Sequence, residues 1–191
     1  MENNIKERNI MVTLAGKYRG PYFEKIKILK KELIEKGIDV LYPPEGDMSD
    51  DKYGFFNDDK RTGDNSKDFA RAEILFDHKT LQKCDAIIFC NYDGYIGRTT
   101  MKELYFFSAL IASNYEKNQD DYYNYLDEYI PIYLLEKIDI DSLKNNDEIG
   151  NIASLLEYGI EKGLIKVGIN SFYDDIEKGR ISNMKRKHHR K

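Results

Sequence analysis

The sequence has few of the features that mark membrane, secreted and polybasic proteins. Its 191 residues include only two cysteines, Cys84 and Cys90, which lie in one apolar stretch and indicate reduced core thiols rather than a disulfide framework. No apolar run approaches the roughly 20 residues that span a bilayer, and the amino-terminal residues lack the apolar segment of a signal peptide. With 34 acidic and 30 basic side chains, the chain lacks the positive excess of polybasic nucleic-acid binders. We therefore expect a cytoplasmic globular protein that makes no membrane contact.

The basic residues are concentrated at the carboxyl terminus. Five Lys and Arg side chains lie in residues 185–191, so the rest of the chain carries about −9 against a total of −4. Residues 179–191 are interpreted as a disordered, solubilising tail. The alternative is an electrostatic contact of this tail with nucleic acid or another partner.

Apolar residues recur with strand and helix periods in turn along the chain. The expected strands are residues 10–15, 38–42, 85–90 and 130–135, and the helices between them are 22–36, 69–84 and 100–115. This alternation predicts an α/β protein with a Rossmann-like (flavodoxin-like) parallel sheet flanked by helices.

Residues 1–178 are expected to form a single domain. Its core is residues 10–135. Residues 136–178 are interpreted as a helical extension, with a helix at 148–162 and either a last strand or further extension at 164–169.

Ligands of open parallel sheets bind beyond the carboxyl ends of the strands. The loop there after the first strand contains Gly16, Lys17, Arg19 and Gly20, and it leads into a helix whose free N–H groups favour an anion. This loop predicts a phosphate or carboxylate site. A tight turn with solvated basic residues is the alternative. A second loop, residues 45–66, is rich in Asp, Gly, Asn and Ser, and its length favours a functional or a disordered segment.

The loop after the third strand leads into a helix through Thr100 and Glu103. Their spacing is that of a capping box, in which Thr100 caps the helix and Glu103 bonds back to its backbone. The functional alternative places the Glu103 carboxylate at the helix start, where the dipole lowers its pKa and keeps it ionised. An ionised, positioned carboxylate can attack an anomeric carbon.

Four local matches over residues 10–135 resemble the nucleoside 2-deoxyribosyltransferase-like superfamily, which includes nucleoside 5′-monophosphate N-glycosidases. The matches are the first strand running into Gly16-x-x-Arg19-Gly20; Asp77 eight residues before Asp85; Gly94-Tyr95-Ile96-Gly97-x-Thr99-Thr100-x-x-Glu103; and the continuation Leu104-Tyr105-Phe106-Phe107-Ser108-Ala109.

The resemblance implies roles for the matched positions. Glu103 would be the nucleophile that takes the sugar C1′, and Asp77 would assist protonation of the leaving group or orient the substrate. Arg19 would hold a 5′-phosphate, while Gly97, Thr99 and Thr100 would line the sugar or phosphate pocket. The candidate substrate-binding residues are Gly16, Lys17, Arg19, Gly20, Asp93, Gly97, Thr99 and Thr100.

The resemblance therefore implies hydrolysis or transfer at the N-glycosidic bond of a nucleoside or nucleoside 5′-monophosphate. It implies a homo-oligomer, and no cofactor or metal is expected. Two positions depart from the family pattern: Val12 stands where the transferases have a Tyr, and Gly97 where they have an Asp. These departures favour the alternative of a non-catalytic nucleotide-binding sensor or regulatory module on the same fold.

Overall fold

The computed structural model describes residues 9–18, 20–43, 66–117, 130–144 and 150–181. Residues 182–191 of the expected tail at 179–191 and most of the expected loop at 45–66 lie outside these residues. The first residues of that tail are packed and not disordered, since Arg180 pairs with Asp175 and Ile181 is buried. The strands are β1 (Met11–Gly16), β2 (Asp39–Tyr42), β3 (Ala86–Cys90), β4 (Ile132–Leu134) and β5 (Ile165–Val167). The α-helices are α1 (Gly20–Glu35), α2 (Ser66–Lys83), α3 (Arg98–Lys117), α5 (Ile140–Lys144), α6 (Gly150–Glu161) and α7 (Ile169–Glu177), and a 3-10 turn, η4, spans Tyr92–Gly94.

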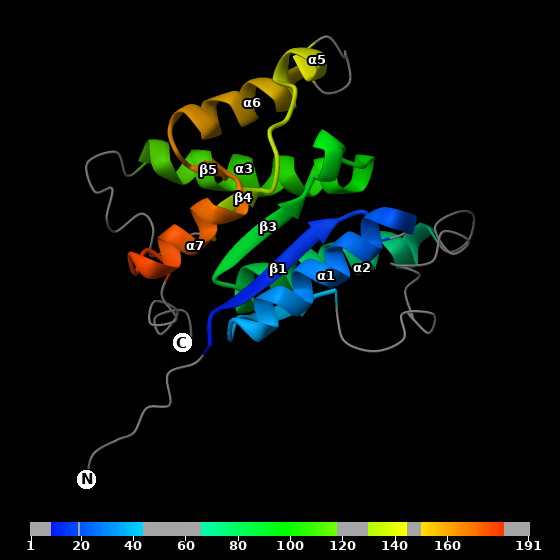
Figure 1. The fold of residues 1–191 in the computed structure, drawn as a ribbon. Helices are drawn as coiled ribbons and strands as arrows, with labels where there is room; N and C mark the ends of the chain where they lie inside the picture. The colour runs from blue at the N-terminus through cyan, green and yellow to red at the C-terminus, as the bar shows by residue number, and fades with distance from the viewer. Residues whose placement is uncertain (1–8, 19, 44–65, 118–129, 145–149, 182–191) are drawn as a thin grey trace, which may run out of the picture.

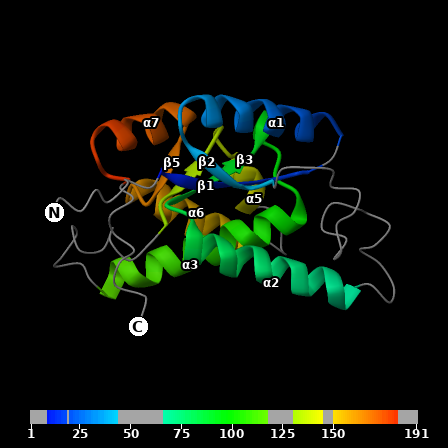
Figure 2. The same cartoon turned by 90° about the horizontal axis from the view of Figure 1, so that it is seen from below.

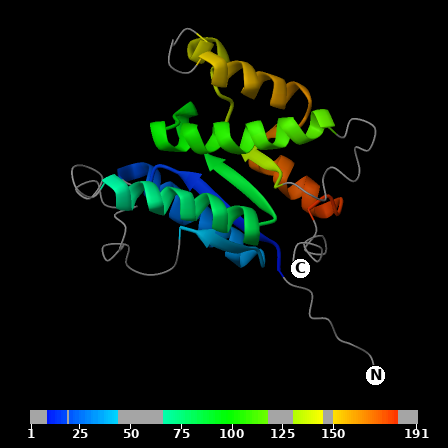
Figure 3. The ribbon, with the colours of Figure 1, turned by 180° about the vertical axis from the view of Figure 1, so that it is seen from behind.

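The five strands form one sheet in the order β2-β1-β3-β4-β5, and every neighbouring pair is parallel. Helices α1 and α7 cover one face of the sheet, while α2 and α3 cover the other (Figures 1 and 2). Helix α6 lies beside α3, as the view from behind also shows (Figure 3). The predicted α/β class with a flavodoxin-like parallel sheet is confirmed.

The centre of the sheet is apolar because β3 has neighbours on both sides and helices on both faces. Every residue of β3 is buried, and Val12 and Leu14 of β1 are inaccessible to solvent. Gly37 ends α1 with a positive φ of 78°. Its N–H donates to the carbonyl of Ile34 and the next N–H, of Ile38, donates to that of Leu33, which is the double bond of a Schellman motif. The chain can therefore turn directly from α1 into β2.

The carboxyl-terminal part of the chain completes the sheet. Strand β5 lies within the expected segment 164–169 and pairs in parallel with β4, so residues 136–178 are more than a helical extension. Helix α7, which follows β5, was not expected and covers the same sheet face as α1 (Figure 2). Within the described residues, none of the helices combines the length and apolar character that a bilayer crossing requires.

Candidate functional site

The strand order reverses direction between β1 and β3. From β1 the chain moves outward to β2, and it then crosses back to β3 on the other side of β1. In sheets of this order, such a switch point opens a crevice at the carboxyl ends of the two strands. Gly16 and Cys90 are register partners at those two ends. The loop after β1 and the loop that leads into α3 therefore lie next to each other.

Helix α3 begins earlier than the sequence suggests, and this overturns the capping-box interpretation. The N–H of Met101 donates to the carbonyl of Gly97 at 2.8 Å, which makes Gly97 the N-cap and puts Thr100 inside the first turn. Glu103 lies six residues beyond Gly97, about 9 Å along the helix axis. The macrodipole acts mainly within the first turn, so its effect at Glu103 is weaker than the sequence suggests.

Glu103 is a buried carboxylate at the candidate site. Only 6% of the residue is exposed, although it lies between the exposed Lys102 and the buried Leu104. Leu104 and Phe107 continue the buried face of α3, and Phe107 packs edge-on to Phe89 of β3. Glu103 is therefore held in place by a helix packed against the central strand.

Tyr18 is an electrostatic neighbour of Glu103 on the β1 side. It is 8% exposed, and its hydroxyl donates to the carbonyl of Leu14. Burial, followed by the nearby Glu103 carboxylate, raises the pKa of Tyr18 well above its usual value. Tyr18 therefore remains a neutral phenol. Only the fold brings positions 18 and 103 together, so no local pattern in the sequence pairs Tyr18 with Glu103.

Lys17 lies beside a stacked pair of tyrosine rings at the same edge of the sheet. Its Nζ is 5.1 Å from the ring centroids of both Tyr22, on α1, and Tyr95, on the loop before α3. The two rings are stacked, with centroids 5.5 Å apart and planes at 25°. Cation–π contacts of this kind attract an ammonium group to aromatic faces. They join the β1 loop to the β3 loop across the switch point.

A second set of contacts joins α1 to the η4 turn. Lys25 pairs with Asp93 at 3.1 Å, and the Tyr92 hydroxyl donates to the Lys25 carbonyl at 3.1 Å. Asp93 has a φ of 58°, a left-handed conformation that Asp tolerates better than most residues. Next to these residues lies a groove of about 390 Å³ lined by Lys25, Leu29, Tyr92 and Glu136, among others. A larger hollow of about 510 Å³ lies at the far end of α1, beside Gly37 and Tyr173.

Most of the predicted site residues gather at the switch point. Gly16 ends β1, Lys17 follows it, and Gly20 begins α1. Gly97, Thr99 and Thr100 form the start of α3, and Asp93 lies on the turn before it. Arg19 lies outside the described residues, so its predicted contact with a phosphate stays a prediction.

Asp77 lies next to Phe76, whose ring packs against that of Tyr42 at the carboxyl end of β2, with centroids 4.8 Å apart. It is on α2, six residues before the helix ends at Lys83, which places it about 9 Å along the axis from that end. Its neighbours Phe76 and Thr80 are buried, and Asp77 itself is partly buried. Its predicted role toward a leaving group stays a prediction. In the described parts of the chain, no three His, Cys, Asp or Glu side chains form a group that could hold a metal ion.

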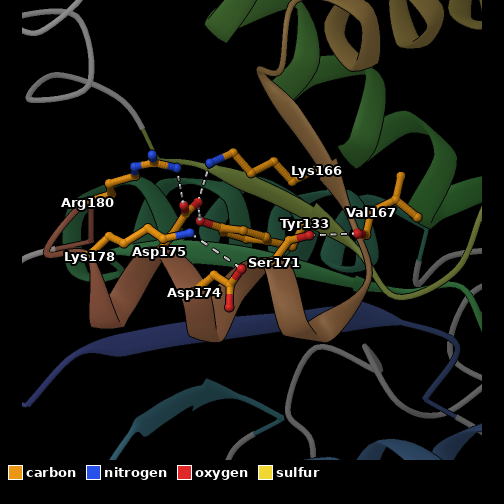
Figure 4. Close-up of polar contacts among 8 residues, drawn as sticks. All are labelled: Tyr133, Lys166, Val167, Ser171, Asp174, Asp175, Lys178 and Arg180. Carbon is orange, nitrogen blue, oxygen red and sulfur yellow. Dashed lines mark hydrogen bonds and ion pairs between the residues drawn. The ribbon is translucent and has the colours of Figure 1, made fainter.

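A second buried carboxylate, Asp175, lies on α7 and is 3% exposed (Figure 4). Its Oδ2 accepts hydrogen bonds from the Tyr133 hydroxyl, at 2.7 Å, and from Lys166, and its Oδ1 accepts one from Arg180 at 3.1 Å. Burial raises the pKa of Asp175, but the hydrogen bonds from Lys166 and Tyr133 outweigh it, so the pKa lies below its usual 3.8. Tyr133 and Lys166 are register partners on β4 and β5, so Asp175 ties α7 to both strands.

The two carboxylates therefore have different surroundings. Asp175 is held by hydrogen bonds and ion pairs with side chains of two strands and of the segment after α7. Glu103 lies at the switch point beside a neutral phenol.

Comparisons with family models, curated proteins and solved structures give no match for this chain.

Proposed function

We propose that this chain cleaves or exchanges the N-glycosidic bond of a nucleoside or a nucleoside 5′-monophosphate, with Glu103 as the nucleophile. One observation carries the proposal: a nearly buried carboxylate lies at the β1/β3 switch point, where ligands of this sheet type bind. The gathering of Gly16, Lys17, Thr99 and Thr100 at the same edge supports it.

The proposed reaction is a double displacement. A Glu103 oxygen forms a bond to C1′ while the C1′–N bond breaks, and the departing base nitrogen takes up a proton. In the second step, water or a second base attacks C1′ from the other side, and the Glu103 carboxylate is released. With water as acceptor, the hydroxyl goes to C1′ and the proton that water loses balances the one taken by the base.

The other residues have supporting roles in the proposal. The family resemblance implies that Asp77 assists protonation of the leaving base or orients the substrate, and that Arg19 holds the 5′-phosphate. Lys17 adds a positive charge beside Gly16, at the end of β1, in a chain whose body is acidic. An acidic body repels phosphates on average, so a local positive group is required to attract one.

We extend the proposal to a cytoplasmic homo-oligomer. The resemblance implies an assembly in which neighbouring subunits complete the site. Large exposed apolar side chains on α2 and α3 support a contact surface there: Ile74, Tyr105 and Phe106 are 67%, 44% and 41% exposed.

Base release tests the proposed reaction directly. Wild-type protein is incubated with deoxynucleoside monophosphates, nucleosides and an NAD-like substrate, and the free base is measured by chromatography. Glu103→Gln should abolish release because an amide is a poor nucleophile. Glu116→Gln is the matched control, since Glu116 is exposed on the same helix and an amide oxygen can still accept the hydrogen bond from Tyr158.

Two outcomes would contradict the proposal. One is the absence of base release by the wild type with every substrate. The other is undiminished release by Glu103→Gln. A nucleotide that raises the melting temperature of both the wild type and Glu103→Gln, with no turnover, would instead identify the non-catalytic binding module.

A further inference from the structure

Tyr95 presents a half-exposed aromatic ring at the ligand-binding edge of the sheet. It lies on the loop between β3 and α3, and 45% of the residue is exposed. Its ring stacks on that of Tyr22, with centroids 5.5 Å apart and planes at 25°. Tyr22 is partly buried, and the Nζ atoms of Lys17 and Lys25 lie 5.1 Å and 5.8 Å from its ring centroid. Tyr22 is therefore largely surrounded, whereas Tyr95 keeps nearly half of its surface for a ligand.

The loop that carries Tyr95 is held in place by α1. The N–H of Tyr95 donates to the carbonyl of Tyr92 at 3.1 Å, which closes the η4 turn. The Tyr92 hydroxyl donates to the carbonyl of Lys25, and the Lys25 ammonium pairs with Asp93. Both contacts fix the loop to the helix that also carries Tyr22. The ring pair is therefore formed before a ligand binds, which lowers the entropic cost of binding.

The Tyr95 ring also lies against the start of the helix that carries Glu103. A Cβ atom on Gly97 would be 3.9 Å from the Tyr95 hydroxyl oxygen and 4.0 Å from its Cε1. Gly97 is the N-cap of α3 and offers no side chain to a ligand. The base of a nucleoside is bonded directly to C1′, so a reaction at Glu103 requires a base site near this helix. Tyr95 supplies an aromatic surface there.

We propose that the Tyr95 ring is the base-binding surface of the site and that it binds nucleobases by stacking, with Tyr22 supporting the ring from behind. This inference rests on the proposed function. Every nucleobase has a flat π-face, so stacking accepts all of them, whereas hydrogen bonds to the base edge would select one. The site should therefore discriminate weakly among bases, with purines favoured over pyrimidines because their rings are larger.

Calorimetric titration of Glu103→Gln protein tests the proposal without turnover. The ligands are the four deoxynucleoside 5′-monophosphates and, as the matched ligand without a base, 2-deoxyribose 5-phosphate. The four nucleotide Kd values should agree within about tenfold, with purines the tighter. Adding Tyr95→Leu should weaken every nucleotide by about tenfold or more and 2-deoxyribose 5-phosphate by less than about twofold. Tyr95→Phe keeps the ring, so its Kd values should stay within about threefold.

Tyr173→Leu is the matched control. The Lys36 Nζ lies 5.1 Å from the Tyr173 ring centroid, the same separation as that between Lys17 and Tyr95. This pair lies at the far end of α1, beside the hollow near Gly37. Removing the Tyr173 ring should therefore change the nucleotide Kd values by less than about twofold.

Each outcome decides the proposal. Unchanged nucleotide binding in Tyr95→Leu, an equal loss in Tyr95→Phe, an equal loss for 2-deoxyribose 5-phosphate or a preference of about 100-fold for one base would overturn it. Absence of nucleotide binding would overturn it as well. Base release by the wild type together with any of these results would leave the proposed function standing. The expected Kd pattern without base release would contradict the proposed function and leave Tyr95 as the base site of a non-catalytic module.

Discussion

Glu103 and Asp175 are both carboxylates with almost no exposed surface, but they lie in different regions of the sheet. Asp175 is 3% exposed and accepts hydrogen bonds from a tyrosine, a lysine and an arginine near the β4–β5 edge. Glu103 is 6% exposed and lies at the β1/β3 switch point, beside a phenol whose proton is donated to Leu14. Removing one partner of a buried ion pair destabilises the fold, whereas a carboxylate at a strand-end crevice is placed to meet a ligand. On the proposed function, Glu103 takes part in the reaction, whereas the contacts of Asp175 hold elements of the fold together.

The substitution Glu103→Gln tests this division most strongly. We expect base release to fall by about 10³-fold or more, because the nucleophilic oxygen is lost. The melting temperature should change little, since the amide is nearly isosteric with the carboxylate. Turnover and thermal unfolding are measured on the same preparation. A large loss of stability with no loss of turnover would reverse the assignment.

The substitution Asp175→Ala should lower the stability of the fold rather than the rate of base release. Removing this carboxylate leaves the Tyr133 hydroxyl and Lys166 without their acceptor, and we expect a loss of about 2 kcal/mol in the free energy of unfolding. This figure is below that of a fully buried pair because Lys166 and Arg180 are 32% and 53% exposed. Urea unfolding measures the loss. Asp174→Ala is the control. Asp174 pairs with Lys178 at 3.6 Å on the exposed side of α7, and its removal should change stability by less than about 0.5 kcal/mol.

The substitution Arg19→Ala sharpens the comparison on the functional side. If a 5′-phosphate binds Arg19, the variant should raise KM for monophosphates by about tenfold and leave KM for free nucleosides nearly unchanged. Steady-state kinetics with a matched nucleoside and monophosphate pair measures the difference. Equal effects on both substrates would show that Arg19 does not bind the phosphate.

The pH dependence of stability gives the smallest expected effect. Since the pKa of Asp175 is lowered from 3.8, its ionised form stabilises the folded chain above that pH, and this contribution is lost as pH falls toward the folded-state pKa. Between about pH 5 and pH 3, the wild type should therefore lose stability more steeply than Asp175→Asn. Urea unfolding at several pH values measures both slopes. Parallel slopes would mean that Asp175 contributes no linked proton.

The sheet was predictable because its strongest signals are local. The unbroken apolar run of β3 indicates a strand covered on both faces, and Gly37 marks the end of α1. The start of α3 was not predictable in the same way. Thr and Gly are about equally common as N-caps, so residue preference does not choose between Thr100 and Gly97, and in the structure the carbonyl of Gly97 accepts the first helical bond.

The contacts that distinguish the two carboxylates are long-range and leave little trace in the sequence. Tyr18 and Glu103 are 85 positions apart, and no local pattern pairs them. Strand β5 gave a weak signal because it is only three residues long and carries Lys166 at its centre. The fold explains this lysine in the middle of a strand, because α7 places Asp175 where it accepts a hydrogen bond from Lys166. Helix α7 begins at Ile169, two residues after β5 ends at Val167. In the sequence, the strand and the helix therefore look like one short amphipathic segment.

The Asp175 cluster also bears on how the last third of the chain unfolds. A three-residue edge strand on its own would be expected to open one residue at a time. Here, one side chain joins β4, β5 and the segment after α7, and the backbone N–H groups of Arg180 and Ile181 donate to the Asp175 carbonyl as well. Opening any one of these elements therefore breaks bonds made by the others. The β4–β5–α7 edge of the sheet should consequently behave as one cooperative folding unit rather than as a fraying end.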